Sequence, residues 1–202
     1  MVWCIHFCAA RSVEPLQKSE PVDNAGMTEF ILLRHGETDW NRELRFQGQV
    51  DVPLNAVGHT QAQRLAQRLA VEPVHHLVSS DLLRTRQTAQ PILDLARTAQ
   101  APSLVTDAML REQNFGRIDG MRVEDIKNQH ADVWAGWTQF QSDYAVPDGE
   151  STRQFHTRVM DAMQRLAAAY AGQTLVVVTH GGVLDMLYRT VHGLGLNGPR
   201  QS

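Results

Sequence analysis

Two histidines stand in matching positions, each after a short apolar run and directly before a glycine. The two segments are ILLRHG (31–36) and VVVTHG (176–181). Such runs predict buried β-strands, and the carboxyl ends of parallel strands meet at one edge of a sheet, where ligands bind. We therefore expect His35 and His180 at the same edge, with glycines that let the backbone approach a ligand closely.

Arginine side chains are expected at the same edge. Arg34 directly precedes His35, and Arg84 follows SSDLL (79–83) at the end of another expected strand. A neutral imidazole is a competent nucleophile near its ordinary pKa of about 6.5, and a guanidinium orients a phosphoryl group through paired hydrogen bonds. Because a phosphate monoester is close to dianionic at neutral pH, attack on it needs such cationic donors. These residue types therefore indicate phosphoryl chemistry.

The segment LLRHGETDWN (32–41) resembles the signature of the histidine phosphatase superfamily, in its phosphoglycerate mutase-like branch. The resemblance covers residues 28 to 190 and implies an α/β three-layer sandwich, with a mostly parallel central sheet flanked by helices. It rests on five further blocks in the family's order: RFQGQVDVPLNAVGHTQA (45–62), SSDLLRTRQTA (79–89), LREQNFGRIDG (110–120), PDGES (147–151) and VVVTHGG (176–182).

The resemblance implies a catalytic role for five residues. His35 resembles the nucleophile that becomes phosphohistidine, and Arg34 flanks it in the phosphate pocket. Arg84 and His180 resemble the other members of that pocket, with His180 protonated in the complex. Glu112, in the LRE segment, resembles the proton donor that protonates the departing oxygen and then activates the hydrolytic water.

Further positions are implied to bind the substrate. Asn41 resembles the residue that hydrogen-bonds the phosphoryl oxygens, and the Gly181 amide is expected beside the phosphate. Gln47 and the Gly48 backbone match positions that line substrate access. Covalent catalysis of this kind implies no metal and no other cofactor, because arginine and histidine supply the positive charge.

The elements that must position these residues alternate between strand and helix, which indicates one α/β domain around a largely parallel sheet. Gly58 predicts a helix boundary, and Pro91 predicts a break or kink in the second long helix. Ser151 and Gln154 form a capping box. The predicted strands are 30–33, 74–79, 103–106 and 175–178, and the predicted helices are 60–70, 81–96, 123–130, 133–140, one opening at 151, and one ending near 191.

The two ends of the chain are expected to differ from the central domain. Residues 1–26 contain two prolines, mixed charge and no periodicity over 11–26, which predicts a flexible N-terminal extension before a histidine phosphatase domain at 27–202. Members of the family normally continue after the last helix into an edge strand, and this sequence reaches Ser202 without one. We therefore expect a C-terminally short domain that lacks the final edge strand and leaves a sheet edge open.

Composition excludes several classes of protein. The net charge of −3 argues against a nucleic-acid partner, and no apolar run approaches the roughly 20 residues that span a bilayer. The only cysteines, Cys4 and Cys8, leave the rest of the chain without a thiolate nucleophile or a Cys-bound zinc. Without a signal-peptide pattern, we predict a cytoplasmic protein whose partner is a small-molecule phosphate ester, with a homodimer left open.

Two other patterns are interpreted as structural. GLGLNG (193–198) satisfies GxGxxG formally, but it follows a predicted helix instead of a strand, so it does not indicate a dinucleotide site. Trp134 and Trp137 stand at helical spacing, which is typical of core or lid packing.

Three activities remain open from the sequence. The first is hydrolysis of small phosphorylated metabolites through phosphohistidine, the second is phosphoglycerate mutase activity, and the third is non-catalytic binding of a phosphorylated ligand. Mutases that resemble this family carry a longer insertion with extra basic residues, whereas here about 35 residues separate Glu112 from Pro147 and contain Arg117, Arg122 and Lys127. This favours hydrolysis, and the presence of every implied nucleophile, arginine and acid disfavours a mere binder.

Overall fold

A five-stranded sheet forms the centre of the computed structural model, which describes residues 2–7, 26–95 and 103–201. The strand order is β1-β2-β5-β3-β4. β2, β5, β3 and β4 run parallel, and β1 pairs antiparallel with β2, so the predicted mostly parallel sheet is confirmed. The strands are β1 (Val2–Phe7), β2 (Thr28–Arg34), β3 (His76–Ser79), β4 (Leu104–Thr106) and β5 (Thr174–Thr179).

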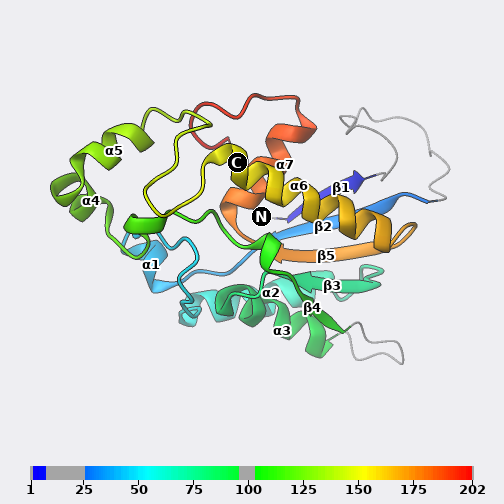
Figure 1. Ribbon diagram of the computed structural model, residues 1–202. Helices are drawn as coiled ribbons and strands as arrows, with labels where there is room; N and C mark the ends of the chain where they lie inside the picture. The colour runs from blue at the N-terminus through cyan, green and yellow to red at the C-terminus, as the bar shows by residue number, and fades with distance from the viewer. Residues whose placement is uncertain (1, 8–25, 96–102, 202) are drawn as a thin grey trace.

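Helices cover both faces of this sheet, as Figure 1 shows. α6 (Thr152–Ala169) and α7 (Gly181–Val191) lie on one face, and α2 (Ala56–Leu69) and α3 (Leu83–Leu95) lie on the other. The three-layer α/β sandwich is therefore confirmed. α6 begins at the predicted capping box, in which the Ser151 side chain accepts from the Gln154 amide and the Gln154 side chain accepts from the Ser151 amide.

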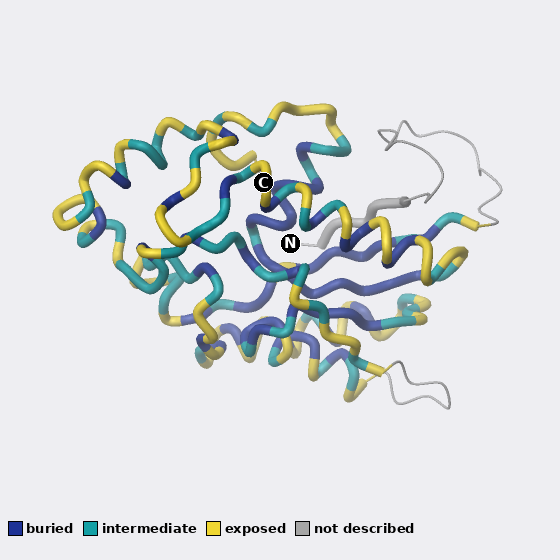
Figure 2. Tube along the Cα trace, viewed as in Figure 1, coloured by how far each residue is buried: buried dark blue, intermediate teal, exposed yellow. Residues whose placement is uncertain are grey.

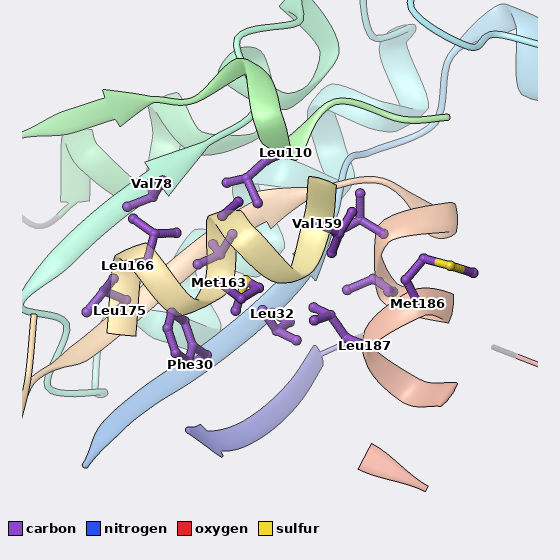
Figure 3. Close-up of a cluster of buried hydrophobic side chains, with 14 of the residues drawn as sticks. Phe30, Leu32, Val78, Leu110, Val159, Met163, Leu166, Leu175, Met186 and Leu187 are labelled. Carbon is purple, nitrogen blue, oxygen red and sulfur yellow. The ribbon is translucent and has the colours of Figure 1, made fainter. Parts of the chain in front are cut away.

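Alternate strand residues supply two separate apolar clusters. Phe30 and Leu32 of β2 pack with α6 and α7, and Ile31 and Leu33 pack with α2 and α3. Side chains alternate between the faces of a strand, so both faces of β2 are buried (Figure 2). Figure 3 shows the α6 and α7 side, where Met163 fills the space above the sheet. Burial of both faces holds the strand ends rigidly.

A smaller unit lies beyond the carboxyl ends of the parallel strands, at one end of the molecule in Figure 1. We call residues 113–150 the cap. It contains a 3-10 turn (Gly116–Ile118), α4 (Val123–Gln129) and α5 (Ala131–Trp137), and the short α1 (Asp39–Arg42) lies near it. A second 3-10 turn (Ala108–Leu110) precedes the cap. The cap has its own apolar cluster, formed by Phe115, Ile118, Ile126, Val133 and Val146.

The predicted helix boundary at Gly58 is wrong, and the helix that contains Pro91 is not broken there. Gly58 lies inside α2, which begins at Ala56 after the Asn55 N-cap. A Cβ on Gly58 would lie 2.1 Å from Glu37 O, so this glycine allows α2 to approach the loop after β2 instead of marking a boundary. Pro91 lies within α3, which runs through to Leu95.

The N-terminal segment differs from the predicted flexible extension. Val2–Phe7 form β1, paired with β2 from Val2 opposite Leu33 to Phe7 opposite Thr28. The remainder of the predicted extension, residues 8–25, lies outside the described residues. The described residues after α7 contain no strand, and β1 pairs along β2 at one edge of the sheet.

Breaking β1 should destabilise the chain, because it would leave the edge of β2 unpaired. Proline cannot donate to a strand ladder, and one of two consecutive residues faces the neighbouring strand. We therefore expect the double substitution Cys4→Pro/Ile5→Pro to lower the Tm by several degrees, since each lost hydrogen bond costs about 1 kcal/mol. Differential scanning calorimetry measures this change.

The matched control is Cys4→Ser/Ile5→Thr, which keeps both backbone donors and should retain most of the wild-type Tm. Light scattering would also show concentration-dependent association of the proline variant, as expected for an exposed strand edge. Equal Tm values for the proline variant and the wild type would show that β1 does not stabilise the sheet.

Candidate active site

The two histidines that follow apolar strands lie side by side. His35 comes directly after β2 and His180 directly after β5, and their ring centroids are 5.3 Å apart. The backbone amide of His35 donates to Thr179 O at 3.0 Å, which ties the two strand ends together. The structure therefore brings both histidines to one edge of the sheet, as the sequence predicts.

His35 has the geometry of a neutral nucleophile. Its Nδ1 lies 2.7 Å from Gly36 O, and a carbonyl only accepts, so Nδ1 carries the proton and Nε2 keeps its lone pair. Burial and the nearby Arg84 charge lower the pKa of His35 to about 3. The imidazole is thus neutral at physiological pH, with Nε2 available for attack.

The sequence suggests that Gly36 lets the backbone approach a ligand, but in the structure Gly36 lies against α2. A Cβ on Gly36 would lie 2.6 Å from Gly58 O, so its small size accommodates the first turn of α2. The Gly36 amide donates to Thr88 Oγ1 on α3. This glycine therefore allows the loop after β2 to pack against α2 and α3.

His180 lies beneath this site and is fully buried. Neither of its ring nitrogens has a hydrogen-bond partner within the described part of the chain. Burial lowers the pKa of His180 well below its usual range, and the Arg84 charge acts in the same direction. A dianion bound next to it would favour the protonated imidazole that the resemblance implies.

Arg84 lies in the first turn of α3, directly after the loop that follows β3, and is fully buried. Its Nη1 and Nη2 donate to Val50 O and Gly48 O, both at 2.8 Å, whereas Nε has no partner among the described residues. Burial lowers the pKa of Arg84 to about 10, so it remains a cation at neutral pH. The loop carbonyls orient the guanidinium and leave one donor for an anion.

Arg34 and Asn41 provide further hydrogen-bond donors at the cavity. The exposed Arg34 side chain makes no hydrogen bond or ion pair within the described ranges, and it lines the same cavity as His35. Asn41 belongs to the capping box at the start of α1, where its Oδ1 accepts from the Thr38 amide and hydroxyl. Its Nδ2 is therefore the atom that remains for a phosphoryl oxygen.

Glu112 approaches the histidines from the segment that precedes the cap. Oε2 accepts from the Gly182 amide at 3.0 Å, and Oε1 accepts from the Gln113 amide at 2.9 Å and lies 3.4 Å from Arg200 Nη2. Burial acts to raise the pKa of Glu112, but Arg200 and the two amides outweigh it, so the pKa is lowered. In the free protein Glu112 is a carboxylate held by fixed donors.

Glycines at the start of α7 make room for this carboxylate. A Cβ on Gly182 would lie 2.0 Å from Glu112 Oε1, so only glycine allows the contact. Gly182 lines the cavity, whereas the predicted substrate-binding Gly181 is not among the lining residues. Gly181 instead lies beside the guanidinium groups of Arg34 and Arg200, where a Cβ would be 3.5 Å from each.

Asp119 packs against the loop that contains Gln47 and Gly48. Gly48 has φ +45°, and a Cβ there would overlap the Asp119 carboxylate. Asp119 accepts from the Gln49 amide at 3.2 Å, and burial raises the pKa of Asp119 to about 6. Gln47 Oε1 is buried without a partner among the described residues. Both Gln47 and Gly48 line the cavity.

A cavity of about 520 Å³ opens onto these groups. Its lining includes polar residues as well as apolar and aromatic side chains from α1, the cap and the C-terminal residues. Of the predicted site residues, His180 and Gly181 lie outside its lining. The others belong to its lining: Arg34, His35, Asn41, Gln47, Gly48, Arg84 and Glu112.

The sequence analysis missed two arginines that brace this site. Arg158 of α6 donates to Met109 O, Arg111 O and Glu112 O, which positions the Glu112 backbone. Arg200 reaches Glu112 from the C-terminal segment 193–201, which we call the strap. The only available signal for the strap was the GxGxxG-like pattern, interpreted as structural, and nothing in it indicates a contact with Glu112.

The strap is anchored by Arg189 of α7. Its guanidinium pairs with Asp185 and donates to four strap carbonyls, those of Gly195, Asn197, Gly198 and Pro199. The Gln201 amide donates to Asp185 Oδ1. The pattern at 193–198 is therefore a loop of backbone acceptors, and it follows a helix as the sequence predicts.

Over residues 26–95 and 103–201, no group of three or more His, Cys, Asp and Glu side chains is arranged to hold a metal ion. None of the described helices is long and apolar enough to cross a membrane.

Residues 30–202 match the sequence profile of the histidine phosphatase superfamily (branch 1). The chain is 39% identical over 172 residues to phosphoglycerate mutase-like protein 4 of Arabidopsis thaliana, covering 84% of this chain and 72% of that one. It is 38% identical over 165 residues to the metal-independent phosphoserine phosphatase of Arabidopsis thaliana, covering 80% and 68%. The solved α-ribazole phosphatase of Shigella flexneri has a TM-score of 0.74 at 27% identity, covering 83% and 81%.

Acid should destabilise the fold through the two buried histidines. His35 is neutral in the folded chain down to its pKa of about 3, whereas an unfolded histidine binds a proton below about pH 6.5. Between these values the unfolded state binds more protons, so the free energy of unfolding falls as the pH falls. The slope is at most about 1.4 kcal/mol per pH unit for each histidine. Urea denaturation from pH 7 to pH 4 measures it.

His35→Asn should reduce this dependence on pH, because it removes one of the two groups. His59→Asn makes the same change at an exposed position on α2 and should keep the wild-type slope. Indistinguishable slopes for the wild type and His35→Asn would refute a buried neutral His35.

Proposed function

Because this chain belongs to branch 1 of the histidine phosphatase superfamily, we propose that it hydrolyses small phosphate monoesters through a phosphohistidine on His35. The observation that supports this most directly is the set of buried side-chain nitrogens without partners among the described residues. Arg84 Nε and the two ring nitrogens of His180 are three such atoms. Arg84 Nε is a donor, and both His180 nitrogens become donors once its ring is protonated. A phosphoryl group is the acceptor that fits them.

The first step is in-line attack by His35 Nε2 on the phosphorus. The N–P bond forms as the ester P–O bond breaks, and Arg34, Arg84 and Asn41 hold the phosphoryl oxygens. Glu112 gives its proton to the departing oxygen, so the product leaves as a neutral alcohol. The bound dianion favours this proton, because a nearby negative charge raises the pKa of a carboxyl.

The second step releases phosphate. Glu112, now a carboxylate, takes a proton from a water that attacks the phosphorus of phosphohistidine. The N–P bond breaks, His35 is regenerated, and Glu112 ends the cycle protonated. Each step uses only side chains of the site and water.

The cap supports hydrolysis over phosphoryl transfer between positions of one substrate. Its basic residues are engaged away from the cavity lining: Arg117 pairs with Asp148, Arg122 pairs with Glu43, and Lys127 lies over the Trp134 ring. A mutase must retain a second anionic group while the phosphoryl group moves. The names of two relatives, a phosphoserine phosphatase and an α-ribazole phosphatase, agree with hydrolysis, while another relative is named phosphoglycerate mutase-like.

The wild-type chain should release phosphate from p-nitrophenyl phosphate in the presence of a metal chelator. His35→Ala should lower this rate by roughly 10³-fold or more, because the nucleophile is lost. His59→Ala, an exposed histidine on α2, should leave the rate unchanged. Formation of 2-phosphoglycerate from 3-phosphoglycerate without phosphate release would establish a mutase instead, and an absence of both reactions would refute catalysis.

Glu112→Gln should slow the turnover of alkyl phosphates by roughly 10²–10⁴-fold, because the leaving oxygen then departs without a proton. With p-nitrophenyl phosphate, whose leaving group needs no proton, an acid-labile phosphoryl adduct should still form. Rapid quenching at high pH followed by mass spectrometry detects it. The double variant His35→Ala/Glu112→Gln should form none, and loss of the adduct in Glu112→Gln alone would argue that Glu112 is structural.

A further inference from the structure

Aromatic and aliphatic side chains line part of the cavity that also contains His35. Trp40 comes from α1, Leu44 and Phe46 from the following loop, and Trp137 and Phe140 from the cap. Three of these rings are in contact, with centroids 5.0 Å apart for Phe46 and Trp137 and 5.4 Å apart for Trp137 and Phe140. We call these five residues of the lining the aromatic wall.

Two residues of the aromatic wall are held in an unusual backbone conformation. Leu44 has φ +53° and Phe140 has φ +50°, values that large side chains rarely adopt. Backbone bonds hold both: the Val123 amide donates to Leu44 O, and the Gly198 amide of the strap donates to Phe140 O. Such strain persists where the surrounding structure imposes it, often at binding sites. Leu44 is also 70% exposed, and contact with water is unfavourable for its apolar side chain.

Cations near the aromatic wall already have partners. Arg45 pairs with Glu43 and donates to Gly120 O, and Arg189 is bonded to Asp185 and the strap. Arg200 lies against Glu112. Among the arginines of the described lining, Arg34 and Arg84 are the ones with no carboxylate partner there, and both serve the phosphoryl group. The carboxylates of Glu112 and Glu150 also line the cavity and are paired with Arg200 and Arg158, so a second anionic group would have to compete with them for these cations.

We infer that the preferred substrates are phosphate monoesters of apolar, flat alcohols, with the alcohol seated on the aromatic wall and the phosphoryl group at His35. This substrate class rests on the proposed function, because the wall shares its cavity with the nucleophile. The volume of about 520 Å³ lies within the range of small-molecule pockets. Burial of the alcohol covers apolar surface that is otherwise in contact with water, which stabilises the complex.

The test compares alkyl esters whose leaving groups have similar basicity, so that differences report binding of the alcohol. The wild type should hydrolyse 2-phenylethyl phosphate with a kcat/KM at least tenfold above that for ethyl phosphate. For 3-phosphoglycerate, which carries an additional carboxylate, kcat/KM should be no higher than for ethyl phosphate. Phosphate release is measured for all three esters, with His35→Ala beside each.

Two variants reduce the aromatic wall. Phe140→Ala and Leu44→Ala should each lower the ratio of kcat/KM for 2-phenylethyl phosphate over ethyl phosphate by threefold or more, because each removes apolar surface that only the larger alcohol covers. Leu95→Ala is the matched control for Leu44→Ala, because Leu95 is 53% exposed at the end of α3 and does not line the cavity. Leu44 is exposed, so its truncation tests the wall even where Phe140→Ala fails to fold.

The outcomes separate this inference from the proposed function. A preference for 3-phosphoglycerate over 2-phenylethyl phosphate, or a ratio that neither wall variant changes, would overturn the substrate class while leaving the phosphatase intact. Failure to release phosphate from any ester, or release that persists in His35→Ala, would overturn the proposed function itself.

Discussion

β2 and β5 pair in parallel with Arg34 opposite Thr179, so the next residues, His35 and His180, leave the sheet side by side. Both faces of these strands are packed in separate apolar clusters. A slip of one residue would turn every strand side chain to the opposite face and expose apolar surface to water. Apolar packing in the two clusters therefore sets the position of the polar groups, which lie one residue beyond the buried strands.

This rigid edge holds polar groups at a cost in stability. Arg84 and His180 are fully buried, and three of their nitrogen atoms have no partner in the described structure. A buried donor without a partner costs about 1–3 kcal/mol, which the apolar clusters must offset. Under the proposed function, a phosphoryl group that accepts from Arg84 and from a protonated His180 would remove part of that cost and bind only the folded state. Ligand binding would then stabilise the fold.

Much of the fold and several polar residues of the site could be predicted, because short segments of the sequence indicate them. Four apolar runs predicted the four parallel strands, and the motifs predicted His35, Arg84 and Glu112, which the structure brings together. Features that depend on tertiary contact could not be predicted in this way. Gly58 has the pattern of a helix boundary, and only its contact with the loop after β2 shows why a glycine stands inside α2.

The aromatic wall and the strap were missed for the same reason. The pair Trp134 and Trp137 was expected to pack in a core or lid, yet Trp134 lies against the cap cluster while Trp137 also faces the cavity. The spacing of the two tryptophans along the helix does not distinguish a residue that packs in a core from one that lines a cavity. The GLGLNG segment has no side chain that marks its function, because Arg189 binds its carbonyls. Through this backbone contact the strap carries Arg200 to Glu112, whose charge it stabilises in the free protein. In the mechanism that we propose, a phosphoryl dianion next to the same cations opposes that stabilisation, which is how Glu112 would gain its proton before the leaving group departs.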